Sequence, residues 1–276
     1  MKKISIIMGI YNCSSTLPEA VNSIINQTYN NWELIMCDDG SSDDTYFVAK
    51  TFADNYSNII LIKNESNMGL NYTLNRCLDI ATGEYIARMD GDDVSLPTRL
   101  EKELHFLETR HDYAFVGTPM IYFNENGDFG IGLGDREPQC ADFVYGSQFS
   151  HATVLVRKEI YDIVGGYSVS KSFLRVEDWH LWIKIYSKGY RGYILSEALY
   201  KMRDDGNALR RRKFKYRINE ARVICLAVKE LNLPAWKCIF AVKPILTALL
   251  PKSIYMFFHK NCLKMDRRMD RRCFLV

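Results

Sequence analysis

The sequence predicts an α/β protein: a mostly parallel β-sheet flanked by helices, followed by a basic helical region. Short apolar runs of strand length alternate with segments of helical periodicity over about the first hundred residues. The chain has 276 residues and is 47% hydrophobic, so it can bury a sizeable core. Residues 1–200 hold 17 Lys and Arg against 27 Asp and Glu, whereas residues 201–276 hold 19 against 6. The two parts are therefore expected to face different partners.

The first predicted strand is the continuous apolar run ISIIMGI at 4–10, as expected for a strand covered on both faces. A helix follows it, because Leu17, Val21 and Ile24 recur at helical spacing behind a Ser/Thr and Pro start. Although a basic tip precedes this run, no small-residue cleavage site follows, so we expect a strand rather than a signal peptide.

Three more strands are predicted in the first half of the chain, each followed by a helix. They lie at 32–37, 59–63 and 84–89. Beyond residue 110 the pattern loosens. Strands are expected at 113–123 and 152–156, a hairpin or loop at 124–135, and an amphipathic helix at 177–189 that ends at Gly189.

The C-terminal region, 204–276, is expected to be helical and strongly basic. From 207 onward, cationic residues lie beside Trp, Phe and Leu, a composition that suits helices resting on an anionic membrane surface. Lys237, Lys243 and Lys252 interrupt the apolar stretch, so no run is long enough to span a bilayer. The alternative is that these helices pack on the rest of the protein, or on another subunit, and expose their charges to water.

Eight cysteines are scattered singly, without a C-x-x-C pair or clustered histidines. This usage is typical of reduced thiols in a cytosolic protein rather than of a disulfide framework or a zinc site.

Two acidic clusters follow predicted strands: Asp38 with Asp39, and the group Asp90, Asp92 and Asp93. Ligands of open parallel sheets bind beyond the carboxyl ends of the strands. If the backbone stays extended through Gly91, Asp90 and Asp92 point to the same side, about 7 Å apart. Carboxylates without nearby Cys or His favour Mg²⁺ or Mn²⁺, which can bridge nucleotide phosphates. The alternative is an acidic turn that caps the helix around Pro97.

Five sequence blocks resemble a known family. In order, they are ISIIMGIYN, WELIMCDDGSSDDT, NESNMGLNYTLNRCLDIATGEYIARMDGDD, HATVLVRKEIYDIVGGY and EDWHLWIKI. Together they resemble the inverting glycosyltransferases of family 2, which have the GT-A fold. The resemblance covers residues 1–203 and implies a nucleotide-sugar donor lying across the carboxyl edge of the sheet. A hydroxyl of the acceptor would displace the diphosphate.

The resemblance implies a set of donor-side residues. Tyr11 would pack near the base, although a surface tyrosine is an equal alternative. Asp39, with Asp38 beside it, would contact uracil; the alternative is a turn carboxylate that caps the next helix. Asp90 and Asp92 would meet the ribose and the metal, Mn²⁺ or Mg²⁺.

Three further residues lie near the implied donor site. Asn67 and Arg76 would border the nucleotide, unless they serve packing or surface roles. Asp93 is expected to support the residues that bind the ligand, or to cap a helix, rather than to bind the ligand itself.

On the acceptor side, the resemblance implies that Asp178 is the general base, because a sugar hydroxyl is too weak an acid to attack without losing its proton. Its place at a helix start would keep it ionised. Glu177, Trp179 and His151 would lie nearby. The alternatives are that Glu177 and Asp178 only cap the helix, that Trp179 is core, and that His151 is structural.

The resemblance also implies limits on the reaction. No Q-x-x-R-W stretch occurs, which favours transfer of a single sugar over polymerisation. The segment after LYKMR reads DDGN where the family often has a histidine, so a further contact there is in doubt.

The predicted function is therefore transfer of one sugar from a nucleoside diphosphate sugar, preferably a UDP-sugar, to a glycan or lipid-linked saccharide in surface polysaccharide assembly. The reaction is expected in the cytoplasm, with the enzyme peripheral on the inner face of the cell membrane.

One alternative function is that of a sugar nucleotidyltransferase, but the loop after the first strand lacks the Gly-rich, Arg-containing pattern of that class. A nucleic-acid partner is not expected, because the tail has no recognisable binding motif and the acidic front would repel phosphates.

Overall fold

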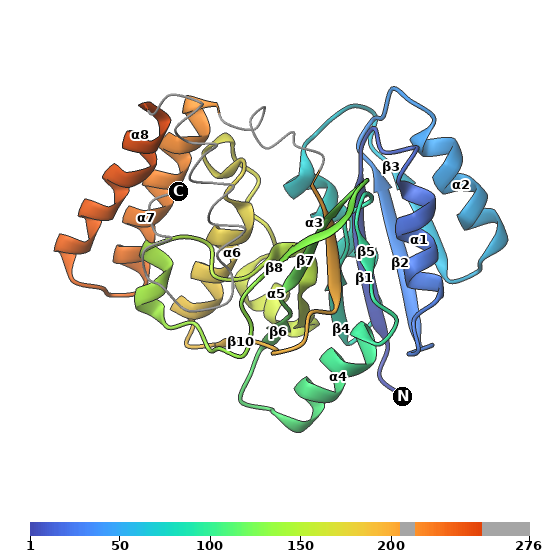
Figure 1. The fold of residues 1–276 in the computed structure, drawn as a ribbon, viewed down its shortest axis with the longest axis horizontal. Coiled ribbons are helices and arrows are strands. Elements are labelled where there is room, and N and C mark those ends of the chain that lie inside the picture. The colour runs from blue at the N-terminus through green and yellow to red at the C-terminus, as the bar shows by residue number, and fades with distance from the viewer. Residues whose placement is uncertain (205–212, 250–276) are drawn as a thin grey trace.

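The computed structural model describes residues 1–204 and 213–249, and its centre is a seven-stranded sheet (Figure 1). In spatial order the strands are β10 (Gly192–Ile194), β6 (Phe115–Gly117), β9 (Leu155–Arg157), β4 (Tyr85–Arg88), β1 (Ile4–Ile10), β2 (Trp32–Asp38) and β3 (Ile59–Lys63). Only β9 is antiparallel to its neighbours in this sheet, while the other pairs are parallel. The prediction of a mostly parallel sheet is confirmed.

Helices cover both faces of this sheet. One face carries α1 (Leu17–Ile25), α2 (Thr45–Asn55) and α4 (Arg99–Thr109), and the other carries α3 (Leu70–Ile80), α5 (Lys158–Val164) and α6 (Glu177–Ser187). Successive residues of β1 point to opposite faces, so Ile6 and Met8 pack with α1 while Ile7 packs with α3. Burial on both faces explains why the β1 sequence is apolar at nearly every position.

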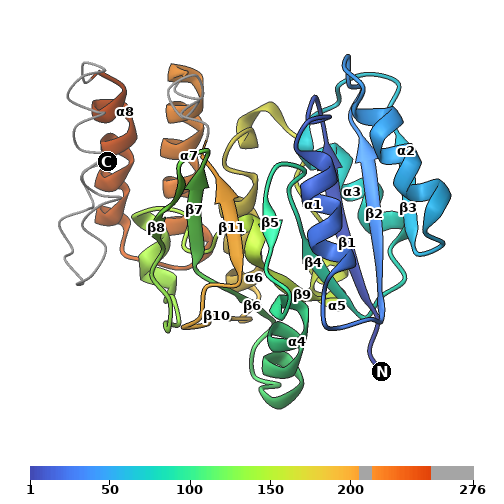
Figure 2. The same cartoon turned by 45° about the vertical axis from the view of Figure 1, so that its right-hand side comes forward.

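A second, four-stranded sheet was not predicted from the sequence. Its order is β5 (Val94–Ser95), β11 (Tyr200–Arg203), β7 (Met120–Asn124) and β8 (Gly127–Ile131). The single strand predicted at 113–123 is divided in the structure between β6 of the main sheet and β7 of the second sheet. β8 pairs with β7 and lies in the segment 124–135 that was expected to be a hairpin or loop. β11 pairs with β5, which directly follows the acidic segment 90–93, and β11 ends in Arg203. The second sheet therefore brings residues from distant parts of the sequence to the acidic segment (Figure 2).

The C-terminal region contributes α7 (Phe214–Glu230), the 3₁₀ helix η5 (Ala235–Ala241) and α8 (Val242–Leu249). These helices lie at the end of the molecule opposite α2 (Figures 1 and 2). Val223, Ile224 and Ala227 of α7 are buried in the same core cluster as α6. In the described part of the chain, no helix is long and apolar enough to cross a membrane.

Candidate active site

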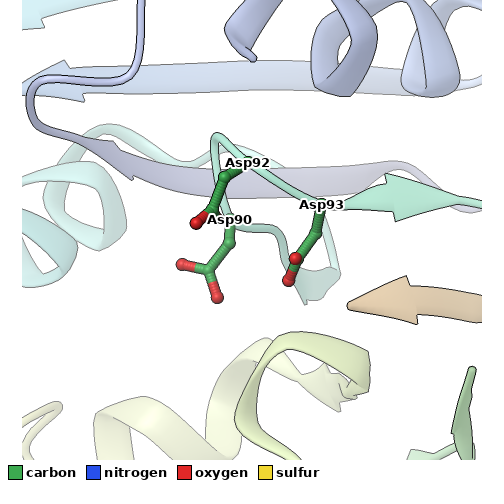
Figure 3. A group of neighbouring side chains, drawn as sticks. All are labelled: Asp90, Asp92 and Asp93. Atoms are coloured by element: carbon green, nitrogen blue, oxygen red, sulfur yellow. The ribbon is translucent and has the colours of Figure 1, made fainter. Parts of the chain in front are cut away.

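The acidic segment forms a tight loop at the carboxyl end of β4. β4 ends at Arg88 and a turn forms at Gly91 and Asp92, so the predicted extended backbone through Gly91 is wrong. The turn gathers the carboxylates of Asp90, Asp92 and Asp93, and one oxygen from each lies within 4.8 Å of the others. All three side chains project toward the same side of the loop (Figure 3).

Gly91 allows the acidic loop to lie against the end of β1. A Cβ atom at Gly91 would be 2.9 Å from Cys13 Sγ and 3.2 Å from Ile10 Cγ2. Both distances are closer than ordinary van der Waals contact, so a larger residue would push the loop away from β1.

Asp93 supports the loop from inside the protein. It is buried, and its carboxylate accepts hydrogen bonds from Tyr200 Oη at 2.9 Å and from the backbone N–H of Arg203 at 2.8 Å. Burial and the negative charges of Asp90 and Asp92 raise the pKa of Asp93 to about 8. Asp93 is therefore held by donors of the protein, whereas Asp90 and Asp92 line a cavity described below.

A cation fits this donor set. Three carboxylates gathered so closely repel one another, which adds to the effect of burial in raising the pKa of Asp93, and a divalent ion would relieve that repulsion. The ligand atoms are hard oxygens, as Mg²⁺ and Mn²⁺ prefer. Asp90 and Asp92 would hold the ion, which would neutralise charge on a diphosphate leaving group.

Two cavities adjoin at the carboxyl edge of the main sheet, and both are lined by Gly9 and Tyr11. The first, of about 420 Å³, also contains Asp90, Asp92 and Arg203. The second measures about 320 Å³; its other lining residues include Asp39, Asn67, Leu70, Arg175, Glu177 and Tyr216. Both volumes lie in the range of small-molecule sites.

Asp39 lines the second cavity and also fixes the loop beside it. Its carboxylate accepts hydrogen bonds from the backbone N–H groups of Met68 at 2.8 Å and Gly69 at 2.9 Å. Asp38 is fully buried and accepts a bond from the backbone N–H of Ser41 at 3.3 Å. Asp39 therefore lines the cavity, whereas Asp38 is absent from both cavity linings.

The other two predicted donor-side residues differ in their positions. Asn67 lines the second cavity. Arg76 is absent from both cavity linings and instead donates hydrogen bonds to the carbonyl of Lys63 at 2.7 Å and to Asn64 Oδ1 at 2.6 Å. Asn64 in turn donates to Asp39 at 2.7 Å. Arg76 thus supports the loop through Asn64, which is the packing role left open above.

Asp178 is the second residue of α6, and its Oδ2 accepts a hydrogen bond from Ser147 Oγ at 2.9 Å. Burial raises the pKa of Asp178, while the Ser147 hydroxyl, nearby backbone N–H groups and the positive charge of Arg88 oppose that rise. Burial therefore outweighs the groups that favour the ionised form, and the ionised state of Asp178 at this helix start stays a prediction. A raised pKa makes the carboxylate a stronger base.

Glu177 precedes Asp178 and lines the second cavity. Burial and the charge of Asp178 raise the pKa of Glu177 to about 7. Its Oε2 is buried and has no hydrogen-bond partner among the described residues. A polar atom of this kind at a cavity wall is available to a ligand hydroxyl.

His151 and Trp179 are not on the cavity walls. Trp179 is buried in the core, where its Nε1–H donates to the carbonyl of Phe143 at 3.0 Å. His151 Nε2 lies 2.7 Å from Tyr167 Oη, and burial together with the charge of Arg88 lowers the pKa of this histidine. Trp179 thus has the core position, and His151 the structural partner, that were left open above as alternatives to contact with the acceptor.

Three site residues escaped the sequence analysis. Arg203 lines the first cavity, donates Nε–H to the carbonyl of Asp92 at 3.0 Å and lies over the Phe123 ring at 4.5 Å. Tyr216 reaches the second cavity from α7. Arg88 is fully buried and forms an ion pair with Asp90. The arginine in the apolar run EYIARM was the available signal for Arg88, since buried charges are rare.

The pH dependence of kcat in the Ser147→Ala variant tests whether Asp178 is the general base. As the general base that the resemblance implies, Asp178 would have to be ionised to accept a proton, so activity would be lost as pH falls through its pKa. Removing the Ser147 hydroxyl removes one interaction that lowers this pKa. We therefore expect the acid limb of the profile of kcat against pH to move to higher pH in the variant. At alkaline pH the kcat values of the variant and of wild type should converge. An unchanged acid limb in the folded variant would contradict this assignment of the base.

The fold and the site together define a glycosyltransferase with the GT-A fold. The model of the family described as Glycosyl transferase family 2 matches residues 5–177. The chain belongs to this family.

Relatives agree with that membership. EpsE of Bacillus subtilis (strain 168), which is assigned as a glycosyltransferase, is 44% identical over 260 residues, covering 94% of each chain. The UDP-Glc:alpha-D-GlcNAc-diphosphoundecaprenol beta-1,3-glucosyltransferase WfaP of Escherichia coli is 34% identical, over 81% of this chain and 86% of WfaP.

A solved structure shares the fold. TarS from S. aureus in complex with UDP-GlcNAc superimposes with a TM-score of 0.68 and 20% identity, over 99% of this chain and 78% of that chain. A second, the mannosyltransferase PcManGT from Pyrobaculum calidifontis with GDP-Man and Mn²⁺, has a TM-score of 0.62 at 17% identity, over 94% and 79% of the two chains.

Proposed function

We propose that this protein is a metal-dependent, inverting glycosyltransferase that moves one sugar from a UDP-sugar to a hydroxyl of a lipid-linked saccharide. The observation that carries this proposal is the pair of adjoining cavities, one with Asp90 and Asp92 and the other with Asp39 and Glu177. The nucleoside would occupy the cavity lined by Tyr11, Asp39 and Asn67, and the diphosphate would lie beside Asp90, Asp92 and Arg203.

The roles of the chain's own residues follow from their chemistry. Arg203 presents a cation beside the acidic loop, where negative charge develops on the departing diphosphate. Asp178 takes the proton of the acceptor hydroxyl as that oxygen attacks carbon 1 of the sugar. Attack on one face and departure from the other invert the configuration at that carbon. The metal, held by Asp90 and Asp92, supplies charge neutralisation at the diphosphate when bound.

The donor proposal is tested by thermal shift with UDP-, GDP- and dTDP-sugars, each with and without Mn²⁺. A ligand that binds only the folded state raises the unfolding temperature according to its concentration and affinity. We expect UDP compounds to stabilise the protein, and to do so more strongly with Mn²⁺. If no nucleotide compound raised the unfolding temperature under either condition, the proposed function would fail.

The acceptor class is supported by the relative WfaP, whose name gives a saccharide on diphosphoundecaprenol as the acceptor. Lipid-carried acceptors lie at a membrane, and we propose that η5 and α8 contact the cytoplasmic surface of an anionic bilayer. A row of apolar side chains there is 48% to 71% exposed: Trp236, Ile239, Val242, Leu246 and Leu249. Lys237 lies over the Trp236 ring at 5.9 Å, which places a cation beside this apolar face.

Vesicle sedimentation tests this contact. We expect wild-type protein to sediment with phosphatidylglycerol-rich vesicles and the Trp236→Ser, Leu246→Ser double variant to bind several-fold more weakly, because buried apolar area drives interfacial binding. Phe47→Ser is the matched control, since Phe47 is equally exposed but lies on α2 at the opposite end of the molecule. Equal binding of all three proteins, or light scattering that shows the row buried in a dimer, would overturn the membrane contact.

A further inference from the structure

Arg88 is a buried cation that none of the roles above explains. It is the last residue of β4, it is 2% exposed, and its guanidinium forms an ion pair with Asp90. Its Nε has no hydrogen-bond partner among the described residues. Taking a guanidinium out of water is costly, and an ion pair with only one partner repays that cost poorly. A residue that served stability alone would be better replaced by an apolar side chain.

The surroundings of Arg88 connect the two halves of the site. On one side, Arg88 meets Asp90 of the acidic loop. On the other, its charge acts on Asp178, and on the buried pair formed by His151 Nε2 and Tyr167 Oη. Arg88 therefore contacts one of the carboxylates that would hold the metal, and its charge also acts on the carboxylate that would accept the proton.

His151 and Tyr167 form a hydrogen-bonded pair on which the charge of Arg88 acts. The Tyr167 hydroxyl is 3.1 Å from that of Tyr161 and 2.7 Å from His151 Nε2. Burial and the charge of Arg88 lower the pKa of His151, so this ring stays neutral and adds no second positive charge. The Arg88 guanidinium is buried and paired with Asp90, so it can fix the orientation of the carboxylate it contacts.

Resting on the proposed function, we propose that Arg88 is a positioning residue for sugar transfer. Its guanidinium holds the Asp90 carboxylate toward the metal side of the cleft and keeps a fixed positive charge that acts on both the acidic loop and Asp178. One side chain would thereby set the geometry of the donor side and the electrostatic surroundings of the base. Neither effect requires Arg88 to touch the substrate.

The experiment uses Arg88→Ala, which leaves a space the size of the missing guanidinium. We expect Mn²⁺ affinity in the presence of UDP, measured by electron paramagnetic resonance of free Mn²⁺, to fall about tenfold, and kcat to fall further. Added guanidinium should restore part of both values. Urea has nearly the same shape without the charge, so urea at the same concentration should restore neither.

Two further variants separate a specific effect on Mn²⁺ binding from a general loss of stability. Arg88→Lys keeps the charge but not the planar fork, and we expect its Mn²⁺ affinity to lie between those of wild type and Arg88→Ala. Arg157→Lys is the matched control: Arg157 lies on β9, and its guanidinium donates to the carbonyl of Tyr113 at 3.1 Å and to Tyr85 Oη at 2.8 Å, at the end of β4 away from the acidic loop. We expect Arg157→Lys to lower the unfolding temperature while leaving Mn²⁺ affinity within about twofold.

The outcomes separate this inference from the proposed function. If wild-type protein binds Mn²⁺ and UDP but folded Arg88→Ala and Arg88→Lys bind them equally well, only the role of Arg88 is wrong. Equal rescue by urea and guanidinium would likewise overturn it, because the effect would then be space filling. If wild-type protein itself binds neither Mn²⁺ nor UDP, the proposed function fails first.

Discussion

In the Asp178→Asn variant, kcat for sugar transfer is expected to fall by about a thousandfold, the usual contribution of a general base. Asparagine matches aspartate in shape, and its carbonyl oxygen can still accept the hydrogen bond from Ser147. What it cannot do is take the proton of the acceptor hydroxyl. The unfolding temperature and UDP affinity should therefore remain near those of wild type.

Initial rates of UDP release at saturating donor and acceptor measure this effect, and calorimetric titration of UDP measures donor binding. Asp162→Asn is a suitable control, because Asp162 is an exposed carboxylate on the neighbouring helix α5. A kcat within about twofold of wild type in a folded Asp178→Asn variant would remove Asp178 from the chemical step.

The second large effect is expected for Asp92→Ala. With Asp92 removed, one of the two cavity-lining carboxylates of the acidic loop is lost, and Asp93 cannot replace it because Tyr200 and Arg203 occupy its oxygens. We expect Mn²⁺ to add little or nothing to the thermal stabilisation by UDP, and kcat/KM to fall about a hundredfold or more.

This result distinguishes catalysis through a metal from simple electrostatic effects of an acidic surface. Asp128→Asn removes an exposed carboxylate that pairs with Lys201 at 2.8 Å on the second sheet, and it should keep the Mn²⁺ response. A Mn²⁺-dependent stabilisation by UDP that persisted in Asp92→Ala would contradict metal binding at this loop.

The sequence predicted β1 to β4 of the central sheet, and the position of the acidic residues after β4, because both depend on local patterns. Apolar runs such as residues 4–10 mark buried strands, and carboxylates after a strand mark the ligand-binding edge. It also placed Asp39, Asn67 and Glu177 on the cleft, where cavity walls now include them.

The parts that could not be predicted depend on contacts between distant segments. Arg203 reaches the acidic loop only because β11 pairs with β5, and strands of two to four residues leave little periodicity to read. The turn at Gly91 follows from its contact with Cys13, which lies 78 positions earlier in the chain. For Trp179 and Arg76, the resemblance indicated the right neighbourhood but not whether each side chain faces the cavity or the interior.

The burial of α7 against α6 sets a minimum length for any shortened form of this enzyme. The family match ends at residue 177, and the resemblance ends at residue 203. A protein cut there would lose the cover that Val223, Ile224 and Ala227 give to the helix bearing Asp178, and it would also lose Tyr216 from the cavity wall. Expression of a soluble fragment therefore requires the polypeptide at least through Glu230, because an uncovered apolar helix promotes aggregation.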